Sequence, residues 1–143
     1  MSGKKNRKGF TLIEMLVVIA VIAVLVAAVV PTVTDATKKA RAATDAANLR
    51  AVLGVLNVDV LSEEKTVDEV IADSLHPTSK MDPNAVLTVV YNKPGFIDVY
   101  YRNGDIYYGL DYLLEVATKT TSSLSTAKPS VPDGSVWYTV QGE

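Results

Sequence analysis

The chain has 143 residues and a formal net charge of −2, which leaves room for one small domain with an extension. It contains no cysteine, and this excludes disulfides, thiolate nucleophiles and zinc–thiolate sites. From Asp59 to the end, 13 acidic residues stand against six basic ones, so this part has a net charge of −7 and shows no direct nucleic-acid site.

The amino terminus combines a basic leader with an apolar stretch. The first nine residues contain four cations and no acid: Lys4, Lys5, Arg7 and Lys8. The next 21 residues, Phe10 to Val30, contain one charged side chain, Glu14. As a helix this stretch would be about 30 Å long, which matches the apolar core of a bilayer. The leader cations favour a cytoplasmic amino terminus and a translocated remainder.

A cleaved secretory signal and a plain signal anchor are two interpretations of this segment. The apolar run is longer than that of a signal peptide, and residues 26–28 match the small-residue cleavage pattern poorly. An anchor fits better, although it places Lys38, Lys39 and Arg41 on the translocated side, against the positive-inside rule. Neither interpretation gives Glu14 a role, although a carboxylate at the centre of a span costs about 2.5–3.5 kcal/mol.

A cut between Gly9 and Phe10 would give Glu14 a partner. It would create an amino group on Phe10, four residues and about one helical turn before Glu14. Ammonium and carboxylate could then pair within one chain or between staggered neighbours. The cut would also remove the leader cations and leave a nearly uncharged helix, able to pack against copies of itself.

The sequence KGFTLIE at residues 8–14 resembles the processing site of type IV prepilins and pseudopilins. The resemblance implies that a prepilin peptidase cuts after Gly9 and methylates the new amino terminus at Phe10. It also implies that Glu14 sets register during assembly. A proline in the position of Pro31, at the outer end of the span, is a further shared feature.

A single long helix is expected from residue 10 to residue 61. Pro31 predicts a kink or a loosened turn near residues 27–31, because its ring opposes the carbonyl four residues back. Beyond it, apolar residues recur at three- and four-residue spacing: Leu49, Val52, Leu56 and Val60. The bent helix would be about 78 Å long. A second face has small residues, which either admit another backbone or reflect helix propensity alone: Ala36, Ala40, Ala43 and Ala47.

The remaining residues predict a short helix and several strands. Thr66 and Glu69 form a capping-box pattern before an apolar set, Val67, Val70, Ile71 and Leu75, and Pro77 ends the helix. Segments 85–91, 96–102, 105–110 and 135–140 are rich in branched and aromatic residues and predict strands. Asn103–Gly104 predicts a hairpin, residues 111–119 a short helix, and residues 120–135 a loop.

The predicted fold class is α+β and type IV pilin-like. A long bent amino-terminal helix, transmembrane in its first half, would pack against an antiparallel sheet of three or four strands. The expected parts are a cleaved leader (1–9), a transmembrane and filament-core helix (10–30), the outer half of the helix (31–61) and a globular head (62–143). Strand order and register are left open.

No set of residues converges on catalysis, so no enzyme, cofactor or metal is predicted. The single histidine, His76, is expected at the surface or a helix end, and there is no Gly-bracketed serine or Gly-rich phosphate loop. Some pseudopilins bind calcium near the carboxyl end, which singles out Asp105, Asp111 and Asp133, with a solvated acidic surface as the default. The seven tyrosines are expected mostly in the core.

The expected function is a structural subunit of a type IV pilus filament. Alternatives are a pseudopilin of a type II secretion or DNA-uptake system, a membrane-anchored binding domain that never polymerises, and a tethered enzyme. The resemblance implies four kinds of partner: copies of the chain or related subunits, the prepilin peptidase and methyltransferase, an inner-membrane assembly platform, and lipid before assembly. The precursor would lie in the inner membrane with its body outside, and the filament would be extracellular or envelope-spanning. Adhesion and twitching motility are left open.

Overall fold

The computed structural model describes residues 9–62, 65–73, 77–92, 95–119 and 124–140. The chain divides into two compact units, residues 1–36 and residues 37–143. One helix, α1 (Leu12–Leu61), runs through both units. It ends at the predicted residue and begins two residues later than predicted.

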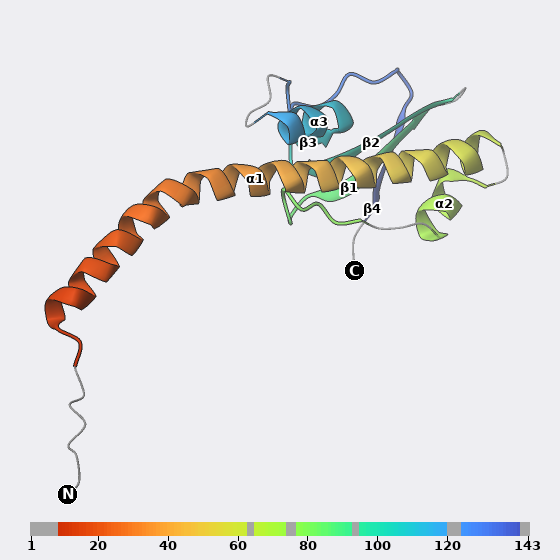
Figure 1. The fold of residues 1–143 in the computed structure, drawn as a ribbon. Helices are drawn as coiled ribbons and strands as arrows, with labels where there is room; N and C mark the ends of the chain where they lie inside the picture. The colour runs from red at the N-terminus through yellow and green to blue at the C-terminus, as the bar shows by residue number, and fades with distance from the viewer. Residues whose placement is uncertain (1–8, 63–64, 74–76, 93–94, 120–123, 141–143) are drawn as a thin grey trace, which may run out of the picture. The chain divides into compact units, whose positions relative to one another are not determined.

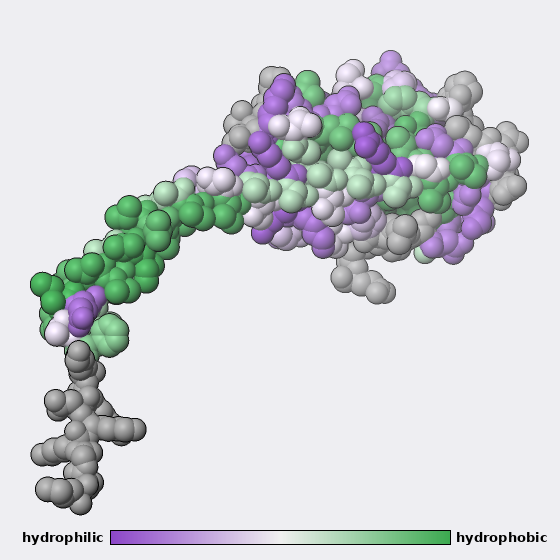
Figure 2. Space-filling model, in the orientation of Figure 1, coloured by the Kyte–Doolittle hydropathy of each residue, from purple (hydrophilic) through white to green (hydrophobic). Residues whose placement is uncertain are grey.

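The first unit is an apolar helical segment with no core of its own. Every described residue up to Ala36 is exposed, and the large apolar side chains from Phe10 to Val30 are between 48% and 82% exposed. The space-filling view shows this part as a nearly continuous hydrophobic surface (Figure 2). Among the described residues, α1 is the one helix long and apolar enough to cross a membrane. Because burying one large aliphatic side chain contributes about 1.5–3 kcal/mol, such a surface is stable only in lipid or against other protein.

The second unit is an α+β body on the outer half of α1 (Figure 1). Its four strands form an antiparallel sheet in the order β3-β2-β1-β4: β1 (Val86–Asn92), β2 (Phe96–Asn103), β3 (Ile106–Gly109) and β4 (Val136–Val140). Two short helices complete it, α2 (Val67–Asp73) and α3 (Leu110–Thr118). The α+β prediction is therefore confirmed, with a long apolar helix packed on an antiparallel sheet of four strands.

The apolar stripe predicted on α1 holds the helix to the body. All four of its members are at most 8% exposed: Leu49, Val52, Leu56 and Val60. Ala42 and Ala46 extend the same stripe, and together they join one core cluster with residues of the sheet, α2 and α3. Spacing of three and four residues places these side chains on one side of a helix. The opposite side of α1 stays exposed at Ala40, Ala43 and Ala47.

The hairpin between β2 and β3 turns one residue later than predicted. Asn103 is the last residue of β2 and pairs with Ile106, so the turn residues are Gly104 and Asp105. Gly104 has φ of 57°, a left-handed conformation that glycine adopts without steric cost. The following helix, α3, starts at Leu110, one residue before the predicted start, because it follows β3 directly.

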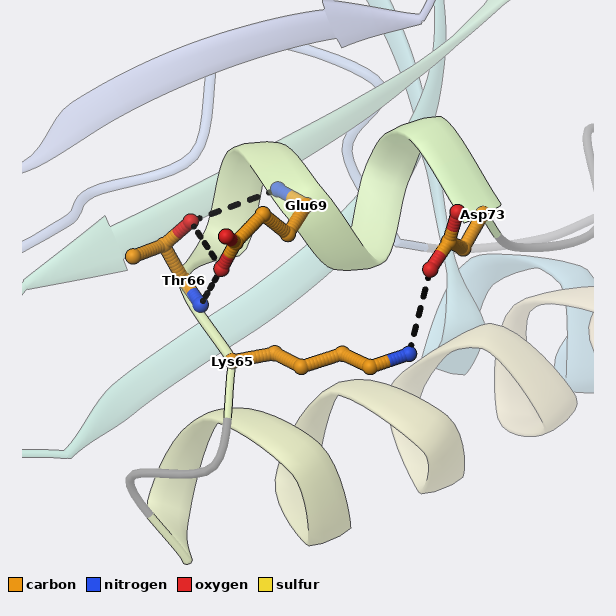
Figure 3. A network of polar contacts seen from close by, with 4 residues as sticks. All are labelled: Lys65, Thr66, Glu69 and Asp73. Atoms are coloured by element: carbon orange, nitrogen blue, oxygen red, sulfur yellow. Dashed lines mark hydrogen bonds and ion pairs between the residues drawn. The ribbon is translucent and has the colours of Figure 1, made fainter.

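The predicted capping box begins α2 (Figure 3). The Thr66 backbone N–H and Oγ1 donate to Glu69 Oε2 at 2.8 and 2.9 Å, and the Glu69 N–H donates to Thr66 Oγ1 at 3.4 Å. These bonds from Thr66 lower the pKa of Glu69. Of the predicted apolar side, Val67 and Val70 are buried and Ile71 is partly buried. The predicted Leu75 and His76 lie outside the described residues.

A buried carboxylate on α1 holds the segment that precedes β1. Asp45 is fully buried. Its Oδ2 accepts hydrogen bonds from Ser79 Oγ at 2.7 Å and from the Met81 N–H at 2.9 Å, and its Oδ1 accepts one from the Lys80 N–H at 2.7 Å. A buried carboxylate is tolerated only when its oxygens are supplied with donors in this way. The bonds therefore fix residues 79–81 against the helix.

We expect Asp45→Ala to lower the free energy of unfolding by about 3 kcal/mol, because one buried and two partly buried donors lose their acceptor. Denaturant unfolding of the full chain in neutral detergent, followed through Trp137 fluorescence, would measure this. Asp68→Ala, which removes an exposed carboxylate, should change the same quantity by less than about 0.5 kcal/mol. Equal effects of the two substitutions would contradict a stabilising role for the Asp45 hydrogen bonds.

Candidate processing and assembly segment

The predicted cleavage site lies outside helical structure. Gly9, Phe10 and Thr11 precede α1, and the Phe10 side chain is 75% exposed. A Cβ atom built on Gly9 would meet no atom within 4 Å, and the backbone there does not have the positive φ that favours glycine. Nothing in the described chain therefore requires glycine at this position. A requirement for it would have to come from a binding partner.

Glu14 takes part in a capping box with Thr11. The Thr11 backbone N–H and Oγ1 each donate to Glu14 Oε2 at 2.8 Å, and the Glu14 N–H donates to Thr11 Oγ1 at 3.3 Å. The first turn of a helix also favours a negative charge through the aligned peptide dipoles. The two bonds from Thr11 both end on Oε2, and Oε1 has no recorded partner among the described residues.

Thr11 is a hydrogen-bond partner of Glu14 that the sequence analysis does not predict. The signal was present, because Thr11 and Glu14 have the same three-residue spacing as Thr66 and Glu69 in the second capping box. In the uncut chain the structure gives Glu14 a hydrogen-bond partner that the sequence analysis does not assign to it. Within the single chain, Thr11 supplies the hydrogen-bond donors that the carboxylate needs.

Pro31 lies inside α1, and the helix continues without a break through this residue. Proline has no amide hydrogen, so the carbonyl four residues earlier loses its usual donor. One turn later, Thr34 Oγ1 donates to the Val30 carbonyl at 3.0 Å. The kink expected at this position stays a prediction.

The other candidate residues of the body do not form a site. Three tyrosines are buried, Tyr100, Tyr101 and Tyr107, and the remaining four are partly buried, Tyr91, Tyr108, Tyr112 and Tyr138. All seven belong to the two core clusters or pack against them, so the expectation that most tyrosines pack in the core is confirmed. Within the described ranges, no three His, Cys, Asp or Glu side chains gather as metal ligands, and this covers Asp105, Asp111 and Asp133.

The amino-terminal segment, with its long exposed apolar helix, fits a membrane-anchored precursor. Residues 4–30 match the family described as the prokaryotic N-terminal methylation motif, which includes Gly9, Phe10, Thr11 and Glu14. The motif supports a precursor of the type IV pilin or pseudopilin kind, a structural rather than an enzymatic class. It implies processing by a prepilin peptidase and polymerisation with pilins. No curated protein and no solved structure matches the chain.

Proposed function

We propose that the chain is the structural subunit of a type IV pilus filament, cut after Gly9 and assembled through residues 10–30. The observation that carries this proposal is the pairing of an exposed apolar helix with a body that has a core of its own. Lipid covers the helix in the precursor, and neighbouring helices cover it in the filament. Most of the free energy of association comes from keeping this apolar surface away from water.

Glu14 sets the register between subunits in this proposal. After the cut, Phe10 carries an ammonium group, and the Thr11 hydrogen bonds leave one Glu14 oxygen available to accept from it. A subunit docked in a wrong register would bury a carboxylate without a cation, at a cost of several kcal/mol. The Thr11 bonds hold the carboxylate at the helix start, so it is oriented before the ammonium arrives.

The outer half of α1 offers a second contact between subunits. Ala36, Ala40, Ala43 and Ala47 are all exposed along one side of the helix. Side chains this small allow another backbone to approach closely, and none of the four belongs to the core of the body. The body can therefore fold first and present this side of the helix unchanged to a neighbour.

Mass spectrometry of the mature amino terminus tests the proposal. The expected species begins at Phe10 and carries one N-methyl group, because the same enzyme is expected to cut and to methylate. A native protein that keeps Met1 to Gly9 and forms no multimers in the cell envelope would overturn it.

A pseudopilin of a type II secretion or DNA-uptake system is the second candidate, since the matched motif occurs in precursors of both kinds. Both use the same cleavage and the same apolar helix. They differ in how far the filament extends, because a pilus forms a long surface fibre and a pseudopilin filament stays short. Electron micrographs that show long surface fibres containing this subunit would favour the pilus, and their absence at normal subunit levels would favour the pseudopilin.

A further inference from the structure

A cationic groove lies in the second unit, between α1 and the segment that Asp45 fixes to it. Its volume is about 570 Å³, and its lining includes Arg41 and Thr44 from α1 and Thr78, Ser79 and Lys80 from the segment. The groove therefore depends on the Asp45 hydrogen bonds, which hold residues 79–81 in place.

The charge of the groove is opposite to that of the body around it. Arg41 and Lys80 line it, and no acidic residue does. Asp45, four residues after Arg41, has both oxygens occupied by donors from Ser79, Lys80 and Met81. The second unit, residues 37–143, has 14 acidic and ten basic residues and therefore a net charge of −4, so the charge of the groove is opposite in sign to that of the unit.

The two cations are available to a ligand. Both side chains belong to exposed residues, and the ion pairs recorded among the described residues involve neither of them. The hydroxyls of Thr44 and Ser79 already donate to the Ala40 carbonyl and to Asp45. The attraction for an anionic ligand therefore comes from the two cations. An arginine guanidinium presents a planar fork of donors that suits the oxygens of a phosphate group.

The lining of the groove begins a few residues after the apolar segment in the chain. Thr37 follows Val30 by seven residues of the same helix, about 10 Å along its axis, and Arg41 follows Val30 by eleven, about 16 Å. The headgroup layer adds about 5–8 Å to each side of a bilayer core. Helical side chains lean toward the amino terminus, so Arg41 and the neighbouring Lys38 and Lys39 lean toward the membrane.

We propose that the groove binds the phosphate of an anionic phospholipid while the precursor is anchored in the inner membrane. The lipid would belong to the leaflet that faces away from the cytoplasm. This gives a role to Arg41, one of three cations that follow the span on the translocated side against the positive-inside rule. Bound lipid holds the body near the bilayer until the subunit is extracted. The inference rests on the membrane-anchored precursor of the proposed function, and it does not require filament assembly.

Native mass spectrometry of the full chain, released from neutral detergent, tests the inference. The probes are dihexanoyl phosphatidylglycerol and, as the uncharged comparison, dihexanoyl phosphatidylcholine. We expect preferential retention of the phosphatidylglycerol. The double variant Arg41→Gln, Lys80→Gln should bind it roughly thirtyfold more weakly. Both residues are exposed, so the fold is expected to survive, and an unchanged midpoint of thermal unfolding would verify this.

The matched control is Arg50→Gln, Lys65→Gln, which removes one arginine and one lysine outside the groove. It should bind phosphatidylglycerol as the unmodified chain does, and the leader cations are the same in all three proteins. Equal weakening by both double variants, or equal retention of the two lipids, would overturn the inference. Displacement of the lipid by an equal concentration of inorganic phosphate would show a site for free anions instead and would also overturn it.

The proposal that Glu14 sets register in assembly is tested separately from lipid binding. Glu14→Ala should bind phosphatidylglycerol normally while forming no filaments. If instead the groove variant binds the lipid as tightly as the unmodified chain and Glu14→Ala still lacks filaments, the lipid inference is wrong and the assembly proposal stands.

Discussion

Glu14→Ala is expected to abolish filaments while leaving cleavage after Gly9 largely intact. The substitution removes the carboxylate that would pair with the Phe10 ammonium, and without this pair no register is favoured over its neighbours. Cleavage should persist because Gly9 and Phe10 lie outside the helix that Glu14 caps. The size shift of the processed subunit on an immunoblot and electron microscopy of surface fibres would measure the two outcomes.

Two further variants separate charge from helix capping. Glu14→Gln keeps an acceptor for the Thr11 donors, since glutamine also serves in a capping box, but it removes the charge. We expect it to lack filaments as well. Glu69→Ala breaks the equivalent box of α2 and should cost the body about 1 kcal/mol while leaving filaments in place. Normal filaments from Glu14→Gln would mean that Glu14 acts as a cap and not as a charge.

Gly9→Val is expected to leave an uncut, unmethylated precursor in the membrane and no filaments. A side chain at residue 9 meets no atom of the chain within 4 Å, so the substitution should not disturb the protein itself. Failure of cleavage would then report recognition by the peptidase. Mass spectrometry of the membrane fraction would detect the residues of the leader.

Gly54→Ala is the matched glycine control for this experiment. Gly54 lies in α1, and a Cβ atom there also meets nothing within 4 Å. Its variant should be cut and assembled normally. If Gly9→Val has no effect on function, the chain acts as a membrane-anchored binding domain that does not polymerise.

Local patterns predicted most of the fold. The spacing of Leu49, Val52 and Leu56 identified the buried side of α1, because a period near 3.6 residues is a property of one helix. The Thr66–Glu69 box was predicted for the same reason, since its partners are three residues apart. Four runs of branched and aromatic residues each became a strand.

Long-range features could not be predicted in this way. Asp45 binds partners 34 to 36 residues later in the chain, and nothing in the alanine-rich sequence around it indicates burial. The order β3-β2-β1-β4 likewise depends on pairing between β1 and the distant β4. Thr11 is a different case, because its partner Glu14 lies only three residues later in the sequence. In an apolar stretch the cost of the Glu14 charge is the most prominent feature, although its nearest donor lies only three residues away.

The bonds between Thr11 and Glu14 have a consequence for subunits that leave a filament. A carboxylate whose donors come from its own chain is never bare, whether the subunit is newly made or has been withdrawn from the fibre. On return to the bilayer the carboxylate therefore keeps its Thr11 donors, although it also keeps its charge. If the proposed filament shortens, a withdrawn subunit would re-enter the bilayer with these two hydrogen bonds intact and could be used again.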